Sequence, residues 1–238
     1  MKAIILAAGR GSRMKHLTEE HPKCLIKLNG KPLIDWQIET IKSAGITEIA
    51  IVTGYKNNLL NNRGLVEFFN HRWETTNMVT SLICADSWLN NNDCIVSYSD
   101  IFYKKSAIKS LVDNKSNLAI TFDPNWEELW SKRFGDPLLD AETFKLKNNK
   151  FLAEIGKPPN LLKEIEGQYM GLLKFTPKGW NIFKEAKVNF FSEKSDNVHM
   201  TSVLQAIIEL NKENITAIPY NDVWGEFDSP EDLNHISI

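Results

Sequence analysis

The chain has 238 residues, of which 42% are hydrophobic and 24% are charged, and its net charge is -2. A chain of this length and composition buries a sizeable core, so we expect a compact globular protein rather than a disordered one. The near-neutral charge argues against the basic surface that binding to nucleic acids or anionic membranes requires.

The apolar run near the start covers only positions 3–8, behind Lys2. This run is too short for a secretion signal, and no stretch reaches the ~18 apolar residues that span a bilayer. We therefore expect a cytoplasmic protein with no membrane partner. The three cysteines, Cys24, Cys84 and Cys94, lack Cys-x-x-Cys spacing, so reduced thiols are expected rather than a disulfide framework or a zinc site.

Residues 3–13, Ala-Ile-Ile-Leu-Ala-Ala-Gly-Arg-Gly-Ser-Arg, join an apolar run to a glycine-rich loop. A continuous apolar run is typical of a strand that is covered on both faces. Gly9 and Gly11 let the loop turn its amides toward an anion, while Arg13 and Lys23 supply charge suited to triphosphate oxygens. The alternative is an ordinary strand-to-helix turn. A Walker loop is excluded because no Gly-Lys-Ser/Thr follows, and a dinucleotide loop because no glycine stands three residues after Gly11.

Further along the chain, Asn29-Gly30 predicts a turn, and Pro32 opens a predicted helix that ends at Gly45. Buried strands are expected at 49–53, 94–98 and 118–122. Strands that alternate with helical patterns favour an α/β fold, with a Rossmann-like, mostly parallel sheet and helices on both faces.

The strand at 94–98 ends in Ser97-Tyr98-Ser99-Asp100. In open α/β sheets, ligands lie beyond the carboxyl ends of the strands, so Asp100 is placed to hold a cation that bridges a triphosphate. Magnesium prefers such oxygen ligands. The alternative role for Asp100 is the N-cap of a following helix.

A second carboxylate comes from the segment 224–233, Trp-Gly-Glu-Phe-Asp-Ser-Pro-Glu-Asp-Leu. Ser229 is expected to cap a helix that opens at Pro230, with Asp232 reaching back to complete a capping box. Asp228 then lies just outside the helix and faces a cleft. The simpler role for Glu231 and Asp232 is that their negative charges neutralise the helix N-terminus.

Three elements in order and spacing, at residues 6–13, 22–23 and 31–34, resemble the signature of nucleotidylyltransferases that activate sugar phosphates and related phosphoesters. The resemblance implies that the glycine loop and Arg13 hold the triphosphate and that Lys23 reaches the phosphates where bond exchange occurs. An acceptor phosphate oxygen would attack the α-phosphorus in line and expel pyrophosphate, with no covalent enzyme intermediate.

The same resemblance implies a catalytic set and a magnesium site. Lys23, Arg13, Asp100 and Asp228 would be catalytic, and the two aspartates would hold Mg²⁺. The implied nucleotide-binding residues are Leu6, Ala7, Ala8, Gly9, Gly11, Ser12, Arg13, Gly54, Tyr55, Asn77 and Ser81.

A narrower resemblance concerns the base and the acceptor. Phe69-Asn70, Thr76-Asn77 and Ser81-Leu82 resemble the stretch of bacterial phosphocholine cytidylyltransferases that contacts cytosine and ribose, and the segment 224–232 resembles the ending of that group and its aminophosphonate-activating relatives. This resemblance implies transfer of CMP from CTP to a small phosphoester or phosphonate such as phosphocholine. The CDP-linked product would serve cell-surface polysaccharide synthesis.

Two alternative functions stay open. One is a hexose-1-phosphate nucleotidylyltransferase that makes an NDP-sugar; such enzymes typically carry Glu-Lys-Pro where this chain has Glu-Ile-Gly-Lys-Pro at 154–158. The other is a nucleotide-binding module without catalysis, whose usual sign would be loss of the lysine or of an acid.

An acceptor with a cationic amine would need aromatic rings or acids near the cation. The acceptor-binding candidates are Lys157, Glu166, Tyr169, Trp130, Trp224 and Glu226. The alternatives are core packing for the aromatic residues and a solvated turn for the lysine. Arg133 would favour a carboxylated acceptor over choline. His199 is the one histidine of interest, with an ordinary polar role as its alternative.

No low-complexity linker, repeat or long charge run divides the chain, so a single domain over residues 1–238 is expected. Residues 1–122 would form its nucleotide-binding half. Residues 123–238 would form its acceptor-binding half, with a small acceptor-side lobe. The expected partners are CTP and the phosphorylated acceptor, with the protein acting as a monomer or homodimer.

Overall fold

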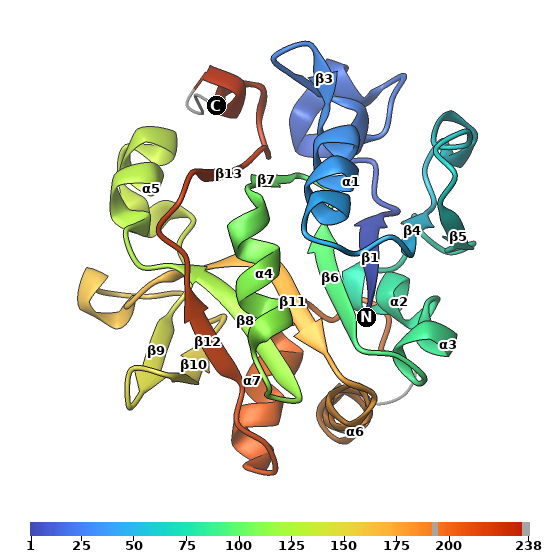
Figure 1. Ribbon diagram of the computed structural model, residues 1–238. Helices are drawn as coiled ribbons and strands as arrows, with labels where there is room; N and C mark the ends of the chain where they lie inside the picture. Colours follow the sequence, from blue (N-terminus) through green and yellow to red (C-terminus); the bar gives the residue numbers. More distant parts are fainter. Residues whose placement is uncertain (192–194, 235–238) are drawn as a thin grey trace.

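The computed structural model describes residues 1–191 and 195–234. Its largest sheet is formed by β1 (Lys2–Ala7), β4 (Ile49–Thr53), β5 (Val66–Phe69), β6 (Cys94–Tyr98), β8 (Leu118–Asp123), β9 (Phe144–Lys147), β10 (Phe151–Ile155), β11 (Gln168–Phe175) and β12 (Thr216–Pro219). The spatial order is β5-β4-β1-β6-β11-β8-β12-β10-β9, and Figure 1 shows this sheet crossing the middle of the molecule. Outside it lie two short pairs, β2 (Lys27–Leu28) with β3 (Lys31–Pro32), and β7 (Ile101–Tyr103) with β13 (Trp224–Glu226).

Helices cover both faces of the sheet. The described residues form α1 (Leu33–Ser43), α2 (Met78–Ile83), α3 (Asp86–Leu89), α4 (Lys105–Asp113), α5 (Trp126–Phe134), α6 (Pro177–Phe191) and α7 (Met200–Leu210). Helices α1 and α4 contact each other on one face, and α6 and α7 do so on the other, where α2 packs on β1 and β4. Short 3₁₀ helices cover Ser12–Thr18, Lys23–Leu25, Asn57–Leu59, Pro137–Leu139, Leu162–Glu164 and Pro230–Asn234.

The strands run mostly in one direction. β5, β4, β1 and β6 are parallel, as are β8 and β12, whereas β11 runs antiparallel to both β6 and β8, and β10 runs antiparallel to β12 and β9. The expected mostly parallel, Rossmann-like α/β fold is confirmed. The reversed β11 begins at the edge where its parallel neighbours end, so residues from both kinds of strand meet there.

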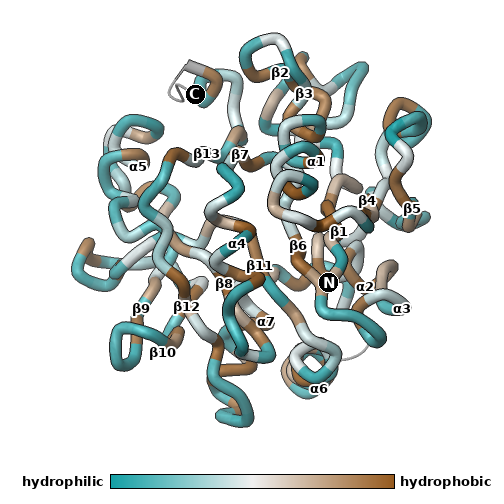
Figure 2. Tube along the Cα trace, viewed as in Figure 1, coloured by the Kyte–Doolittle hydropathy of each residue, from teal (hydrophilic) through white to brown (hydrophobic). Residues whose placement is uncertain are grey.

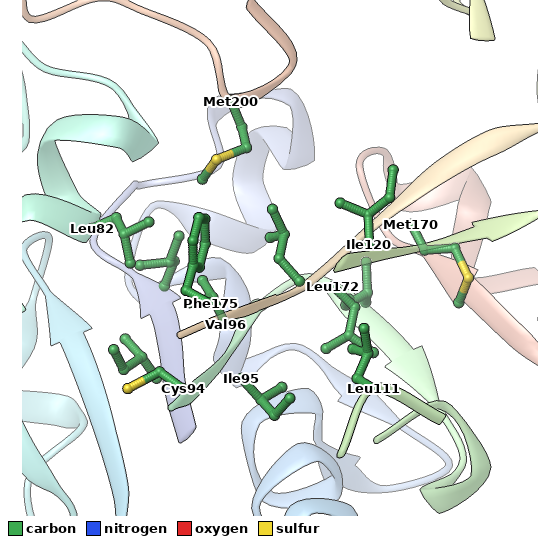
Figure 3. Close-up of a cluster of buried hydrophobic side chains, with 14 of the residues drawn as sticks. Leu82, Cys94, Ile95, Val96, Leu111, Ile120, Met170, Leu172, Phe175 and Met200 are labelled. Atoms are coloured by element: carbon green, nitrogen blue, oxygen red, sulfur yellow. The ribbon is translucent and has the colours of Figure 1, made fainter. Parts of the chain in front are cut away.

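The core is built from the apolar strand runs. Ile4 in β1 is completely buried, and its register partners are Ala50 in β4 and Val96 in β6. Such strands lie between two helical layers and therefore carry apolar residues on both faces. Figure 3 shows Leu82 of α2 and Met200 of α7 on one side of the central strands and Leu111 of α4 on the other. Figure 2 shows the hydrophobic residues gathered along these strands and the hydrophilic ones in the outer loops.

The elements expected from the sequence are present. The strands at 49–53 and 94–98 have the expected bounds, and the one at 118–122 extends by one residue to Asp123. The helix expected at Pro32 begins at Leu33, with Pro32 as its N-cap. No helix of the described residues is long and apolar enough to cross a membrane.

The cysteines are free thiols. Cys24 and Cys94 are buried, Cys84 is half-buried, and burial raises the pKa of Cys24 and of Cys94 to about 12. These thiols are therefore protonated and unreactive at neutral pH.

Candidate active site

The candidate active site lies where the parallel strands end. β1 leads into the glycine loop, and β6 leads through Ser99 to Asp100. Gln168, the first residue of the reversed strand β11, lies at the same edge, opposite Asp123 of β8. This is the edge at which open α/β sheets bind their ligands.

Gly11 shapes the glycine loop. Its φ is +75°, in the left-handed region that favours glycine, and an added Cβ would lie 2.7 Å from the Cβ of Lys23. A side chain at position 11 is therefore excluded twice, by the backbone conformation and by the close approach of Lys23. The carbonyl of Gly11 also accepts hydrogen bonds from the Met14 amide and the Thr18 hydroxyl, which fix the end of the loop.

The ammonium of Lys23 lies between two carboxylates. Nζ donates to Asp100 Oδ2 at 2.7 Å and also to Asp228 Oδ1. Burial by itself would lower the pKa of Lys23, but Asp100, Asp228 and Glu226 outweigh that effect and raise it to about 12. Lys23 is therefore a fixed positive charge at neutral pH, although its side chain is only 9% exposed.

The ribbon of β7 and β13 brings the two aspartates together. β13 pairs antiparallel with β7, which sets Glu226 opposite Ile101, and the amide of Phe227 donates to the carbonyl of Asp100 at 2.9 Å. Asp232 then accepts from the amides of Asp228 and Ser229, each at 2.8 Å. The bond from the Ser229 amide is the half of the expected capping box in which Asp232 reaches back to the capping residue, and the helix that follows is 3₁₀ rather than α.

Arg133, on α5, forms ion pairs with the acids of the C-terminal segment. Its side chain is 1% exposed; Nε lies 2.8 Å from Asp232 Oδ1 and Nη1 lies 3.2 Å from Glu226 Oε2. Nη2 donates to Asp232 Oδ2 at 3.3 Å, and it lies 3.7 Å from Oδ2 of a third carboxylate, Asp228. Arg133 is committed to these internal partners, so its presence does not favour a carboxylated acceptor as the sequence suggested.

The pKa values of Glu226 and Asp228 are shifted in opposite directions. Burial, followed by the charges of Asp228 and Asp100, raises the pKa of Glu226 to about 8. Burial acts in the same direction on Asp228, but the Lys23 ammonium overcomes it and holds the pKa of Asp228 below its ordinary value. Asp228 is therefore ionised at neutral pH.

Replacing Asp232 with asparagine is expected to lower the free energy of unfolding by about 3 kcal/mol at pH 7, because buried Arg133 loses a charged partner. Burial works to raise the pKa of Asp232, but its hydrogen bonds with Arg133 and the backbone hold the pKa below the ordinary value. A lowered pKa contributes stability above the unfolded-state value of about 4, and this contribution is lost as the pH falls through the folded-state value.

Urea unfolding of the wild type and of Asp232→Asn measures this effect. The difference between the two proteins should shrink as the pH is lowered from about 7 to about 3. A difference that stays constant over this interval would show that the Asp232 charge does not stabilise the fold.

A first cavity, with a volume of about 280 Å³, opens beside the glycine loop. Ten of the site residues predicted from the sequence line this cavity: Leu6, Ala8, Gly9, Gly11, Ser12, Arg13, Lys23, Asn77, Ser81 and Asp100. Trp73 and Thr76 complete one wall, where the buried Asn70 amide donates to the hydroxyls of Thr76 and Ser81.

A second cavity, with a volume of about 270 Å³, adjoins the first through Arg13, Met78 and Tyr98, which line both. Predicted residues in its lining are Trp130, Tyr169, Glu226 and Asp228. The lining also includes His199, so the structure brings that histidine to the site. The acids Asp100 and Asp228 thus stand at the boundary between two adjoining cavities.

Three predicted nucleotide-binding residues lie behind the first cavity rather than in its lining. Ala7 is the last residue of β1, and the Tyr55 amide donates to the carbonyl of Ala8 at 2.9 Å. An added Cβ at Gly54 would lie 2.6 Å from that same carbonyl and 2.5 Å from the Cβ of Trp73. Gly54 and Tyr55 therefore support the cavity wall from outside.

Three predicted acceptor residues lie outside the second cavity. Lys157 is exposed, and Glu166 is exposed with Oε2 accepting from the Leu146 amide at 2.6 Å. Trp224 is buried, and its Nε1 donates to Asp123 Oδ2 at 2.8 Å. Lys157 therefore has the alternative role of a lysine in a solvated turn, and Trp224 has the alternative role of a residue that packs in the core.

Several residues of the second cavity were not predicted from the sequence. The unpredicted polar residues are Asp140, Glu142, Gln168 and Thr201. Gln168 and Thr201 adjoin Tyr169 and His199, which the sequence did single out. Asp140 and Glu142 lie in the segment between α5 and β9, which carries no periodic pattern or motif.

The acids at the boundary fit a divalent cation. Asp100, Glu226 and Asp228 each offer one carboxylate oxygen, and these atoms lie within 4.8 Å of one another. Oδ1 of Asp100 is buried without a hydrogen-bond partner in the part of the chain that the structure describes. A hard cation such as Mg²⁺ prefers such oxygen ligands and is commonly held by one or two carboxylates together with phosphate oxygens.

Comparison with known proteins decides the family. The model of the MobA-like NTP transferase domain matches residues 3–154. The chain belongs to this family. It is a nucleotidyltransferase, and the resemblance seen in residues 6–13, 22–23 and 31–34 is confirmed.

Among its relatives is the CTP:phosphoglutamine cytidylyltransferase of Campylobacter jejuni, 41% identical over 249 residues and covering 98% of each chain. The choline-phosphate cytidylyltransferase of Streptococcus pneumoniae is 40% identical over 106 residues, 43% of this chain and 46% of the relative. A solved structure with the same fold is the inositol-1-phosphate CTP transferase of T. maritima, with a TM-score of 0.77, 19% identity, and coverage of 97% of this chain and 90% of that one.

Proposed function

We propose that this protein transfers CMP from CTP to a small phosphorylated acceptor and releases pyrophosphate. The observation that carries the proposal is the pair of adjoining cavities, with Lys23, Asp100 and Asp228 at their boundary. In the proposed arrangement residues 1–122 supply most of the nucleotide cavity, and residues 123–238 supply most of the acceptor cavity.

The nucleotide is assigned to the first cavity because of the glycine loop. The loop backbone and Arg13 suit the triphosphate oxygens, which need several donors and positive charge. The wall around Thr76, Asn77 and Ser81 offers hydroxyl and amide groups to a base and ribose. CTP is favoured because the Campylobacter jejuni relative, which aligns with nearly the whole chain, is described as a CTP-dependent enzyme.

In the proposed reaction, an oxygen of the acceptor phosphate forms a bond to the α-phosphorus, and the bond from that phosphorus to the bridging oxygen of pyrophosphate breaks. Lys23 and Arg13 stabilise the negative charge on the transferring group and on the leaving pyrophosphate. Asp100 and Asp228 would hold Mg²⁺, which would supply further neutralisation of the phosphate oxygens. Arg133 keeps Asp228 in position through the contacts described above.

Pyrophosphate release in the presence of Mg²⁺ tests the proposal. CTP is offered with phosphoglutamine, phosphocholine, phosphoethanolamine, 2-aminoethylphosphonate and glucose-1-phosphate, and each acceptor is repeated with UTP, dTTP, ATP and GTP. We expect release with CTP and a small acceptor, and none when EDTA removes the metal. Release only when glucose-1-phosphate is the acceptor, or only with another triphosphate, would replace this proposal with the sugar-activating alternative. Binding of CTP without pyrophosphate release in the presence of any acceptor would favour the non-catalytic module.

A further inference from the structure

We propose that Gln37 of α1 positions Asp100, because its side-chain amide binds both ends of the turn that carries this aspartate and thereby sets the divalent-cation affinity of the site. This inference rests on the proposed function, in which Asp100 holds Mg²⁺. Gln37 lies outside the lining of both cavities, so it acts through Asp100 and is a positioning residue.

Gln37 is a polar residue in the core-facing stripe of α1. Positions 34, 37, 38 and 41 follow the helical spacing of a buried face, and the other three positions are isoleucines. Gln37 is only 2% exposed. Burial of an amide is unfavourable unless hydrogen bonds replace its lost contacts with water, so the partners of this side chain indicate its role.

The Gln37 amide binds two backbone carbonyls across a turn. Nε2 donates to the carbonyl of Tyr98 at 2.7 Å and to the carbonyl of Ile101 at 2.6 Å. Tyr98 ends β6 and Ile101 begins β7, so only Ser99 and Asp100 lie between them. The reverse orientation of the amide would set Oε1 against two carbonyl oxygens, so these partners require the N–H₂ group. One side chain therefore closes the turn that carries the aspartate.

Two other elements hold this turn. From the C-terminal segment, the Phe227 amide donates to the carbonyl of Asp100 at 2.9 Å, and from α1, Gln37 holds the two flanking carbonyls. The Asp100 carboxylate itself has Lys23 at Oδ2, while Oδ1 is buried without a partner among the described residues. The direction of the carboxylate therefore depends on the turn, and a metal site needs its ligands within about 0.5 Å of the productive geometry.

The hydrogen bonds of Gln37 favour a role in fixing the turn over a role in stability alone. The Ser97 hydroxyl donates to the same Tyr98 carbonyl at 2.9 Å, so the end of β6 has a second donor. Oε1 of Gln37 is itself buried without a partner in the described part of the chain, which is unfavourable for folding. What Gln37 adds is the link from Tyr98 to Ile101, and this link spans Asp100.

The test removes this link and measures metal binding. Gln37→Met keeps most of the side-chain length but has no N–H group. Gln37→Glu is the second variant, because a buried carboxyl beside two carbonyl oxygens is protonated, and its single O–H keeps one of the two bonds. Thr176→Val is the matched control, since it removes a hydroxyl that binds Asn117 and the Gly179 amide at the opposite edge of the sheet. Thermal unfolding checks that each variant folds.

Mn²⁺ is titrated into each protein without nucleotide, and calorimetry measures its affinity. We expect ~10-fold weaker binding to Gln37→Met than to the wild type, the effect typical of residues that orient metal ligands. The affinity of Gln37→Glu should lie between these two, and this variant carries the comparison if Gln37→Met does not fold. Thr176→Val should bind Mn²⁺ as the wild type does, even if its melting temperature falls. Equal Mn²⁺ affinity in the wild type and the Gln37 variants, or no Mn²⁺ binding by the wild type, would overturn the inference.

Kinetics separates this inference from the proposed function. In CMP transfer from CTP, the Mg²⁺ concentration that gives the half-maximal rate should rise ~10-fold in Gln37→Met, while KM for CTP at saturating Mg²⁺ stays within ~2-fold of the wild-type value. Weaker Mn²⁺ binding by the variant, with no turnover by either protein, would support the inference and count against the transferase reaction. Turnover by both proteins with the same Mg²⁺ requirement would support the reaction and overturn the inference.

Discussion

Replacing Lys23 with methionine is expected to lower kcat/KM for CMP transfer by a factor of ~10²–10³. The ammonium is the buried cation between Asp100 and Asp228, and removing one preorganised donor from a developing phosphate charge typically has an effect of this size. Methionine keeps most of the side-chain length and fills the space beside Gly11. Pyrophosphate release at saturating Mg²⁺ measures the loss.

A second measurement on Lys23→Met does not depend on turnover. In the absence of nucleotide, Lys23 occupies oxygens of both aspartates, so a divalent cation has to compete with the ammonium. Calorimetric titration with Mg²⁺ or Mn²⁺ alone should therefore show tighter binding to Lys23→Met than to the wild type. Lys31→Met is the control, since Lys31 pairs with Glu39 and lies over the ring of Trp36. Unchanged turnover in Lys23→Met would remove Lys23 from the mechanism.

Asp228→Asn is expected to reduce CMP transfer by a similar factor of ~10²–10³ and also to weaken divalent-cation binding. Its carboxylate contacts Lys23 and Arg13 and lies near Arg133, so the amide leaves three cations with less negative charge between them. We therefore expect a lower melting temperature as well, corresponding to about 3 kcal/mol of lost stability.

The matched control for Asp228→Asn is Asp222→Asn in the same C-terminal segment. Asp222 is exposed, and its partners are the ammonium of Lys104, 3.9 Å away, the hydroxyl of Ser106 and the amide of Val223. Surface contacts of this kind contribute at most about 1 kcal/mol, so this variant should keep both its activity and its melting temperature. A fully active Asp228→Asn would show that Asp100 alone is sufficient for the reaction.

The parts of the fold that could be predicted from the sequence are those with a local signal. The strands at 49–53, 94–98 and 118–122 are uninterrupted apolar runs, and burial on both faces requires such runs. The glycine loop could be predicted from its glycines, because Gly11 adopts a positive φ that only glycine reaches easily.

The parts of the site that could not be predicted depend on tertiary placement. Glu166 and Glu142 are both acids at the edge of a strand, yet only Glu142 lines the second cavity, and nothing in their flanking residues distinguishes them. Arg133 presents a similar case. Its sequence position suggested a ligand contact, whereas three C-terminal carboxylates enclose it in the folded protein.

The position of β12 within the sheet has a consequence for protein synthesis. β12, at Thr216–Pro219, lies between β8 and β10, so the β9–β10 hairpin joins the rest of the sheet only after residue 219 has left the ribosome. Asp228 follows nine residues later. A nascent chain that ends before this point holds Lys23 and Asp100 without their third partner, so the charged cluster is complete only after residue 228 has been added.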